Sequence, residues 1–295
     1  MPAERPLLGA IEAGGTKFVL GVGYGPGDII DQTHIATRDP ATTLAQAVAF
    51  FRPHDKLAAI GIGSFGPLER NRQSLHWGHI LATPKPGWSN CDLAGSFARA
   101  LGAPVAFDTD VNAAALAEAR LGASRDARVS VYITIGTGIG GGVIADGRIV
   151  GGAGHPELGH MMPRRPLHDT QFAGICPFHG DCLEGLASGP AIKARWGASL
   201  SSLPPEHAAH SIIAAYLADA CNTLRAVLAP DAIVLGGGVM ETPGLFGRIV
   251  AAATASDGGY FAAPAARVIR RPGLAPHSGL AGAFELAADL LVGAG

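Results

Sequence analysis

Two glycine-tipped hairpins, one near the start of the chain and one near its middle, constrain the fold most strongly. In the first, the run LLGAIEAGGTKFVLGVG at Leu7–Gly23 has two strand-like arms joined by EAGGTK. In the second, at Val129–Gly147, VSVYITIG leads through a Gly-Thr-Gly tip into another strand-like arm. The chain therefore contains the same motif, a hairpin with a glycine-rich tip, twice.

Strand-like and helical segments alternate along the rest of the chain, which is typical of an α/β fold. DTDVN, at Asp108–Asn112, stands between the strand-like PVAF and a helical segment. We predict further strands in LAAIGIGSFGP, DAIVLGGGVM and ARVIRR, and helices at about His207–Leu228, Gly244–Thr254 and Gly279–Leu291.

The length of 295 residues exceeds the size at which a single hydrophobic core usually stops growing, so we expect two packed lobes. Hydrophobic residues make up 48% of the chain and charged residues 16%, which is typical of a compact globular protein and not of a disordered one. Because no linker rich in proline, glycine or serine divides the chain, topology alone places the lobe boundary near Leu121.

The net charge and the cysteine content indicate which kind of partner and which cellular compartment to expect. A formal charge of -2 gives no electrostatic reason to bind nucleic acid or an anionic membrane, so a small molecule is the expected partner. The N-terminus has no long apolar segment, and Glu285 and Asp289 interrupt the apolar stretch Leu280–Val292, so we expect neither export nor a membrane anchor. Four cysteines, two of them beside a histidine, favour a reduced cytoplasmic protein over a disulfide framework.

Three glycine-rich loops follow strand-like segments. Without side chains, their backbone N–H groups can approach phosphate oxygens closely, and a neighbouring Thr or Lys adds donors. Any tight hairpin also requires glycine, but three such loops together predict that they surround one nucleotide. No P-loop motif is present and no early G-x-G-x-x-G opens a helix, so the contacts to phosphate must be shared between the lobes. The loop residues are Gly14, Gly15, Thr16 and Lys17, then Gly136, Thr137 and Gly138, then Gly236, Gly237 and Gly238.

The acidic turn DTDVN places carboxylates at the expected N-terminus of a helix. Such a carboxylate can accept the proton of a substrate hydroxyl as that hydroxyl attacks phosphorus. The alternative is that Asp108 or Asp110 only caps the helix.

The run CPFHGDC places two cysteines and a histidine at three-residue steps: Cys176, His179 and Cys182. A structural zinc site takes four nitrogen or sulfur ligands in a closed tetrahedron, and this spacing supplies three of them. His160 is the nearest good candidate for the fourth ligand, with His155 and His168 as competitors. The alternative, buried apolar cysteines beside surface histidines, accounts less well for the close Cys/His spacing.

Taken in order, these motifs resemble the ROK sugar kinases, within the actin-like ATPase superfamily. The resemblance rests on EAGGTK, DTDVN, GTGIGGGV, the Glu-x-x-His of HPELGH and the cluster that ends in CLEG, and it covers essentially the whole chain. TPKPGW at Thr83–Trp88 and the CPFHGDC form of the cluster further resemble the bacterial fructokinase branch.

The resemblance implies an α/β, two-lobed actin-like ATPase fold with a duplicated ribonuclease-H-like core and an interlobe cleft where ATP and sugar meet. Residues 1–121 and about 276–295 would form the N-terminal lobe, and residues 122–275 the C-terminal lobe. ATP, Mg²⁺, a structural Zn²⁺ and a homodimer are also implied. The implied reaction transfers the γ-phosphoryl group of Mg-ATP to a hexose, with the 6-hydroxyl of D-fructose as the expected acceptor.

The same resemblance assigns roles to individual residues. Asp110 is similar to the general base of these kinases, and the glycine loops are similar to their phosphate loops and adenosine-side loop. Residues similar to sugar contacts are Gly66, Thr109, Glu157, His160 and Glu184. Residues that align with zinc ligands are His160, Cys176, His179 and Cys182. The alignment gives His160 both roles and does not decide between them.

Two positions depart from the family pattern. Many ROK kinases carry Asp where Glu12 stands, and this difference affects how a metal ion or a metal-bound water is held. Many also carry Asn where Thr109 stands, and this difference affects a contact to the sugar. We expect both departures to tune substrate choice. We also expect zinc to brace the loop that presents Glu157 and Glu184 to the sugar, because a closed four-ligand site has no open position for phosphoryl chemistry.

Other functions within the family stay open as alternatives. Preference among fructose, glucose, mannose and N-acetylmannosamine depends on pocket differences worth only about 1–3 kcal/mol, which motifs cannot resolve. ROK-type sugar sensors carry a DNA-binding helical segment ahead of this domain, whereas here the first strand is expected by about Leu7. Because Asp110 and the phosphate loops are intact, we expect a kinase and not a non-catalytic sugar-binding protein.

Overall fold

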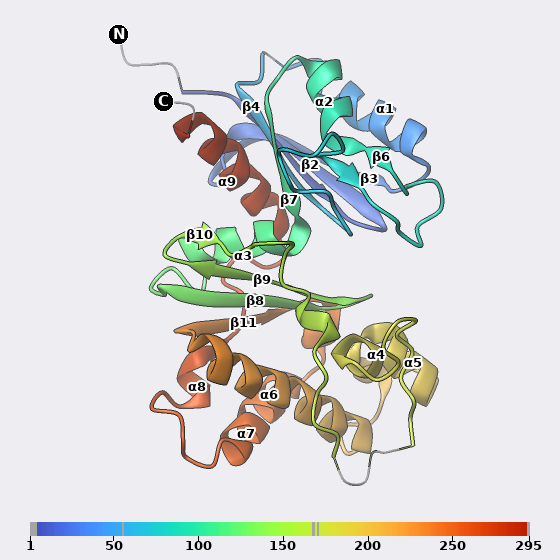
Figure 1. Ribbon diagram of the computed structural model, residues 1–295, viewed down its shortest axis with the longest axis vertical. Helices are drawn as coiled ribbons and strands as arrows, with labels where there is room; N and C mark the ends of the chain where they lie inside the picture. The colour runs from blue at the N-terminus through green and yellow to red at the C-terminus, as the bar shows by residue number, and fades with distance from the viewer. Residues whose placement is uncertain (1–4, 55, 167–168, 170, 294–295) are drawn as a thin grey trace. The chain divides into compact units, whose positions relative to one another are not determined.

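The computed structural model describes residues 5–54, 56–166, 169 and 171–293 (Figure 1). The chain divides into two compact units, Met1–Ala117 with Pro276–Gly295, and Glu118–Ala275. Helix α3, Asp110–Arg120, begins in the first unit and ends in the second.

The first unit is built on a five-stranded sheet in the order β3-β2-β1-β4-β7. β1, β2 and β3 pair antiparallel, whereas β4 and β7 run parallel to β1. Parallel neighbours need crossover connections, which here contain α1 and α2. The bounds are β1 Leu8–Ala13, β2 Lys17–Gly25, β3 Asp28–Ala36, α1 Pro40–Phe51, β4 Ala59–Ser64, β5 His79–Ile80, β6 Cys91–Asp92, α2 Leu93–Leu101, β7 Val105–Thr109 and α9 Ser278–Val292.

Side chains that alternate along the strands fill both faces of this sheet. On one face, Ile11 of β1 joins a cluster that contains Phe97 of α2. On the other face, Ala10 joins a second cluster that contains Phe284 of α9. In Figure 1, α1 and α2 accordingly cover one face of the sheet and α9 the other.

Helix α9 makes two contacts so close that only glycine fits. A Cβ added to Gly61 of β4 would lie 1.8 Å from the carbonyl oxygen of Ala283 in α9. A Cβ added to Gly282 of α9 would lie 1.9 Å from the carbonyl oxygen of Ala113 in α3. The backbone of α9 therefore touches both the interior strand β4 and the first turns of α3, and it fixes the position of the start of α3 on the first unit.

The second unit repeats the plan of the first. Its five-stranded sheet has the order β10-β9-β8-β11-β12, with β8, β9 and β10 antiparallel and with β11 and β12 parallel to β8. The duplicated α/β core expected from the resemblance is confirmed. The bounds are β8 Val129–Ile135, β9 Ile139–Ala145, β10 Arg148–Ile149, η1 Leu158–His160, α4 Leu183–Ala187, α5 Gly189–Trp196, η2 Leu200–Ser202, α6 Ala208–Leu228, β11 Ala232–Gly236, η3 Gly238–Glu241, α7 Leu245–Ser256, α8 Ala265–Val268 and β12 Ile269–Arg270.

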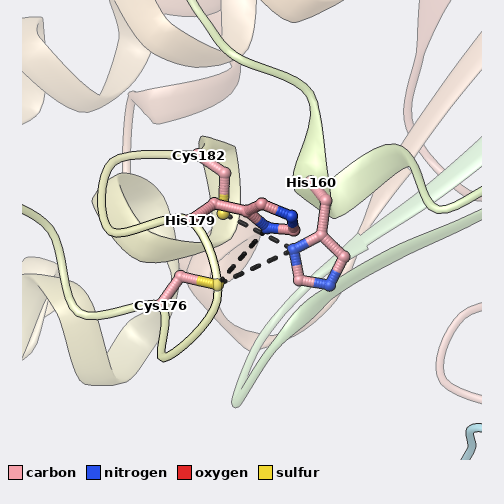
Figure 2. A group of neighbouring side chains, drawn as sticks. All are labelled: His160, Cys176, His179 and Cys182. Carbon is pink, nitrogen blue, oxygen red and sulfur yellow. Dashed lines mark hydrogen bonds between the residues drawn. The ribbon is translucent and has the colours of Figure 1, made fainter.

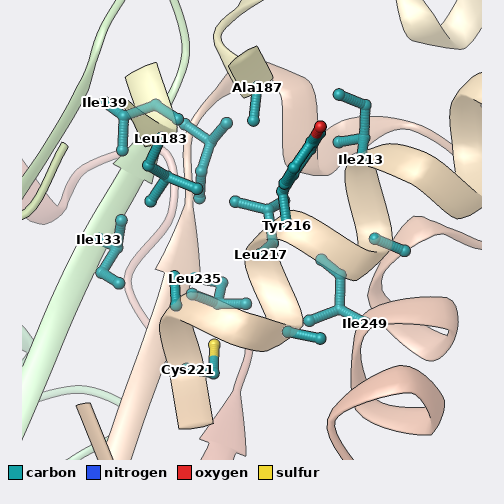
Figure 3. Packing of buried hydrophobic residues seen from close by; sticks show 14 of the residues in the cluster. Ile133, Ile139, Leu183, Ala187, Ile213, Tyr216, Leu217, Cys221, Leu235 and Ile249 are labelled. Carbon is teal, nitrogen blue, oxygen red and sulfur yellow. The ribbon is translucent and has the colours of Figure 1, made fainter. Parts of the chain in front are cut away.

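Helix α6 is the central core helix of the second unit. Figure 3 shows Tyr216 and Leu217 of α6 among apolar side chains from the sheet, such as Ile133 and Leu235, and Ile249 of α7. By length and composition α6 passes as a candidate membrane span, but 56% of its apolar window is buried within the protein. The packing explains this apolar composition, because a helix buried in the core of a globular unit needs apolar side chains just as a membrane-spanning helix does.

Most elements expected from the sequence are present, including both hairpins and the helices at α6, α7 and α9. The prediction that ARVIRR is a strand throughout was wrong. Its first residues belong to α8, and β12 covers only Ile269–Arg270. Pro264 stands just before α8 and its carbonyl accepts the N–H of Arg267, so the alanines that follow enter a helical turn first.

Replacing Gly282 by alanine should lower the free energy of unfolding by about 1–3 kcal/mol, because the new methyl group must displace the backbone of α3. Gly247 in α7 is a matched control, since nothing lies within 4 Å of its added Cβ and alanine favours a helix. Urea unfolding of Gly282→Ala, Gly247→Ala and wild type measures the difference. Equal stabilities of the two variants would contradict the close contact.

Candidate functional site

The tip between β1 and β2 holds the first glycine loop. The N–H of Gly14 donates to the carbonyl of Lys17 at 2.9 Å, which closes the hairpin. Thr37, just after β3, donates its hydroxyl to the carbonyl of Gly14 at 2.7 Å and its N–H to the carbonyl of Thr16 at 2.9 Å. Gly15, Thr16 and Lys17 are exposed. Thr37 therefore fixes the backbone of the tip, while the side chains of Thr16 and Lys17 remain accessible to a ligand.

The second and third glycine loops meet at a cavity of about 360 Å³ in the second unit. Gly136 and Thr137, at the β8–β9 tip, line it together with Gly238 at the start of η3. The carbonyl of Gly136 accepts the N–H of Gly189 at the start of α5, 2.8 Å away. The remaining walls combine apolar side chains with hydroxyl groups: Pro190, Ile192, Leu200, Val239, Ser199, Ser201 and Thr242. Apolar walls with a few hydroxyl groups suit the base and ribose of a nucleotide.

The other glycines of these loops do not line the cavity. Instead, they allow neighbouring segments to approach more closely than a side chain would permit. Gly237 has φ +93°, and its added Cβ would lie 2.5 Å from the nitrogen of Ile135. The added Cβ of Gly236 would lie 2.7 Å from the Tyr132 hydroxyl, and that of Gly138 would lie 2.7 Å from Oε2 of Glu184. These glycines let β11 and α4 approach β8 and the tip that follows it.

The acidic run Asp108–Asn112 covers the end of β7 and the start of α3, at the edge where the neighbouring strand β4 also ends. Asp110 is the first residue of α3, and its Oδ1 accepts the N–H of Val111 at 2.9 Å. Thr109 is buried, and its hydroxyl oxygen accepts the N–H of Asn112 at 3.1 Å. A capping bond at this helix start is thus made by Thr109, the residue expected to contact sugar.

Gly66 lies in the loop that follows β4. Ser64 at the end of β4 is paired with Thr109 at the end of β7, and the two strands are parallel. The Gly66–Pro67 peptide bond is cis. The Gly66 loop and the turn that carries Asp110 therefore leave the sheet at the same edge, which is what a sugar contact beside a base requires.

Glu12 lies near the end of β1 and faces the N-terminus of α9. Its carboxylate accepts the N–H of Leu280, and the added Cβ of Gly279 would lie 2.6 Å from its Oε1. Burial raises the pKa of the Glu12 carboxyl above its usual range, against the opposing effect of the nearby Lys17 charge. This departure from the family pattern therefore places a partly buried carboxylate against a helix N-terminus, where the helix dipole favours negative charge.

Four side chains of the second unit converge on one point: His160, Cys176, His179 and Cys182 (Figure 2). Their ligand atoms all lie within 4.8 Å of one another. The Nδ1 atom of His160 is 3.8 Å from Sγ of Cys176 and 3.5 Å from Sγ of Cys182, and the Nδ1 atom of His179 is 3.7 Å from Sγ of Cys176. Zinc bond lengths of about 2.3 Å to sulfur and about 2.0–2.1 Å to nitrogen place such ligands about 3.6 Å apart in a tetrahedron. The donor set and its spacing fit zinc.

The backbone brings these ligands together through a tight loop. Cys176 and Gly180 exchange N–H to carbonyl bonds of 3.1 and 2.9 Å, and Gly180 turns the chain with φ +67°. Cys182 is the N-cap of α4, and His160 ends η1. The N–H of Leu183 donates to the carbonyl of Met161 at 2.8 Å, which ties the start of α4 to the residue after η1.

The predicted sugar contacts of this region stand next to the cluster in sequence. Glu184 lies on α4 two residues after Cys182, and its Oε2 accepts the N–H of Ile139 at 2.9 Å. Glu157 precedes η1 and pairs with Nε2 of His155 at 3.0 Å, and this hydrogen bond lowers the pKa of the Glu157 carboxyl. His155 thus pairs with Glu157 and is not among the four clustered side chains. His168, the other competitor for the fourth ligand, lies outside the described residues.

One buried acidic side chain between His160 and Cys176 was missed by the sequence reasoning. Asp169 accepts hydrogen bonds from Nη1 and Nη2 of Arg195, at 2.7 and 2.5 Å, and from the hydroxyl of Tyr216. Burial and this contact raise the pKa of Tyr216 to about 12. Arg195 and Tyr216 come from α5 and α6, so Asp169 itself is held against two helices of the second unit. No local pattern marks such a pair in the sequence.

Comparison with known proteins decides the family. The sequence model of the ROK family matches residues 8–290. The chain belongs to the ROK family. The resemblance drawn from the motifs is thereby confirmed.

Individual ROK proteins are similar over nearly the whole chain. The fructokinase of Zymomonas mobilis subsp. mobilis is 44% identical over 295 residues, which cover 97% of this chain and 98% of that protein. The crystal structure of the ROK hexokinase from Thermus thermophilus matches with a TM-score of 0.79 and 28% identity, over 98% of this chain and 100% of that one. A ROK glucokinase from Streptomyces griseus, in complex with glucose and AMPPNP, matches with a TM-score of 0.73 and 25% identity over 96% and 99%. The actin-like ATPase fold of ROK kinases is therefore that of this chain.

The raised pKa of Glu12 predicts a pH dependence of stability. Because the folded-state pKa lies above the unfolded-state value, the carboxyl stabilises the fold below its ordinary pKa, and this contribution is lost as pH rises through the folded-state pKa. The free energy of unfolding of wild type should thus fall relative to that of Glu12→Gln between about pH 4 and pH 7. Urea unfolding of both proteins across this range measures the trend. A difference that stays constant or grows in favour of wild type would contradict the pKa shift.

Proposed function

We propose that this ROK protein is a fructokinase, which transfers the γ-phosphoryl group of Mg-ATP to the 6-hydroxyl of D-fructose. The observation that carries the proposal is the 44% identity with the Zymomonas mobilis fructokinase over 97% of this chain. The ROK hexokinase and glucokinase structures are less similar, at 28% and 25% identity. The higher sequence identity with the fructokinase favours fructose over glucose as the substrate.

Asp110 is proposed as the general base. A carboxylate at the first position of α3 can take the proton of the sugar hydroxyl as it attacks phosphorus. Asp110 and Thr109 each accept one backbone N–H at this helix start, and a carboxylate such as Asp110 has further lone pairs with which to accept the sugar proton. The backbone of Gly66, at the same edge of the sheet, is proposed to contact the sugar.

The glycine loops are proposed to bind ATP. The cavity lined by Gly136, Thr137 and Gly238 would take the adenosine and adjoining phosphates, with backbone N–H groups as donors. The tip Gly14–Lys17, exposed from Gly15 to Lys17, would contact the terminal phosphates, where Lys17 adds a positive charge. Mg²⁺ bound with ATP would neutralise charge on the phosphates, and these loops would hold the phosphates in position for transfer.

The cluster of His160, Cys176, His179 and Cys182 is proposed to hold a structural zinc. His160 would serve both zinc and sugar through different atoms. Its Nδ1 faces the sulfur atoms, whereas its other ring nitrogen points away from them and can donate to a sugar hydroxyl (Figure 2). Zinc bound at Nδ1 would also fix the ring orientation. Glu157 and Glu184, on either side of this cluster in sequence, are proposed as further sugar contacts.

We further propose a cytoplasmic homodimer with no nucleic-acid or membrane partner. Cys91, Cys176, Cys182 and Cys221 are all unpaired, which fits a reducing compartment. The net charge of -2 offers no general attraction to polyanions.

Asp110→Asn tests the proposed base. The change should lower kcat by about 10²- to 10⁴-fold, because the amide cannot take the proton, while fructose still binds. Initial rates of ADP formation and calorimetric titration with fructose measure the two effects. Asp39→Asn is a matched control, because Asp39 caps α1 and asparagine caps equally well. Turnover near the wild-type rate in Asp110→Asn would remove Asp110 from the mechanism.

Cys182→Ser tests the metal and its role. Loss of one buried ligand should reduce bound zinc well below one per chain and raise the KM for fructose by about 10-fold or more, since the loop loses its brace. Elemental analysis of the purified protein and fructose kinetics measure both. Cys91→Ser, outside the cluster, is the control and should keep its zinc. A zinc-free Cys182→Ser protein with unchanged KM would refute the bracing role.

A further inference from the structure

A largely buried ion pair links the loop after β4 to the end of β7 in the first unit. Nη2 of Arg70, in the loop after β4, donates to Oδ2 of Asp108 at 2.7 Å. The two side chains are only 20% and 10% exposed. The other carboxylate oxygen of Asp108 accepts the N–H of Thr109 and the side-chain amide of Asn112, both at 2.7 Å. A single carboxylate therefore binds three donors around the turn that carries Asp110.

Arg70 reaches this turn from a segment that is itself held in place. The N–H of Glu69 donates to the carbonyl of His79 at 2.9 Å, and the N–H of Gly78 returns to the carbonyl of Glu69 at 3.0 Å. The N–H of Leu81 donates to the carbonyl of Pro67 at 2.7 Å. Because this segment begins just after Gly66, the ion pair connects the proposed sugar loop with the turn that bears the proposed base.

The pair is poorly explained as a device for stability alone. Nε of Arg70 and Oδ1 of Asn112 are buried without a hydrogen-bond partner among the described residues, so the network is not fully satisfied. Replacing a buried ion pair by apolar residues is often neutral or stabilising, so such a pair is weak support for a purely structural role. A cavity of about 550 Å³ adjoins both side chains, which leaves Arg70 room to move away if its partner is lost.

We propose that Asp108 and Arg70 form a positioning pair for the phosphoryl transfer. Asp108 keeps Thr109 and Asp110 in a fixed position relative to the loop at Gly66, and Arg70 keeps the Asp108 carboxylate in place. The inference rests on the proposed function, because it takes Asp110 as the base and Gly66 as a sugar contact. Neither Asp108 nor Arg70 is assigned a contact with substrate.

Asp108→Asn and Arg70→Met test the pair. The asparagine side chain would keep an acceptor for the Thr109 N–H but present N–H groups to the guanidinium, and methionine removes the guanidinium while keeping most of the stem. Each change should lower kcat by about 10- to 100-fold through misplacement of the base. The KM values for fructose and Mg-ATP should stay within about 3-fold of wild type, because the ground-state contacts remain. Arg70→Lys can still donate to Asp108 and should recover most of the kcat.

The double variant Asp108→Asn/Arg70→Met separates a pair from two independent effects. Its kcat should lie within about 3-fold of the lower single variant, because both changes break one interaction. Asp257→Asn is the matched control, since Asp257 pairs with Arg225 at 3.4 Å with side chains only 9% and 3% exposed, in the second unit. It should lower the melting temperature without lowering kcat.

Several outcomes would overturn the inference. A kcat for Asp108→Asn within about 3-fold of wild type, or losses in the double variant that multiply, would remove the positioning role. The same would follow if Asp257→Asn lost as much kcat, since the effect would then be general destabilisation. If Asp110→Asn is inactive while Asp108→Asn is normal, only this inference fails. If wild type phosphorylates no sugar, the proposed function fails with it.

Discussion

Parallel pairing of strands fixes where chemistry can occur in each unit. The carboxyl ends of parallel strands meet at one edge of a sheet, so the loops that follow β1, β4 and β7 emerge together. Those loops carry Gly14–Lys17, Gly66 and Asp110. In the second unit, β8 and β11 are parallel neighbours, and the loops that follow them, at Gly136 and Gly238, line one cavity. The duplication of the fold thus gives each unit one edge at which the proposed ligand-binding loops gather.

The side chains at these edges depend on supports placed further back. Gly61 and Gly282 let α9 press against β4 and α3, which sets the start of α3. In the second unit, the buried Asp169, which lies between His160 and Cys176 in sequence, binds Arg195 of α5 and Tyr216 of α6. Loops can hold reactive groups accurately only when such contacts restrict them, because loop backbone by itself has few stabilising bonds.

The sequence predicted the features that have a local signature. Glycine tips between β-rich arms, apolar periodicity in α6 and α9, and the Cys/His spacing each reflect short-range geometry, and the structure has all of them. The side-chain pairs Arg70–Asp108 and Asp169–Arg195 were not foreseen, because their partners are brought together by the fold and share no local pattern. In ARVIRR, the helical turn set up by Pro264 prevailed over the strand propensity of the residues that follow.

The rate of ADP formation by the purified protein with Mg-ATP, compared across fructose, glucose, mannose and N-acetylmannosamine, tests the central claim most directly. We predict strong turnover with fructose and little with the other three sugars, with fructose 6-phosphate as the product. Comparable rates on several sugars would contradict the assignment to fructose while keeping a sugar kinase. No turnover on any of them, in a folded sample with its zinc content measured, would contradict the kinase itself.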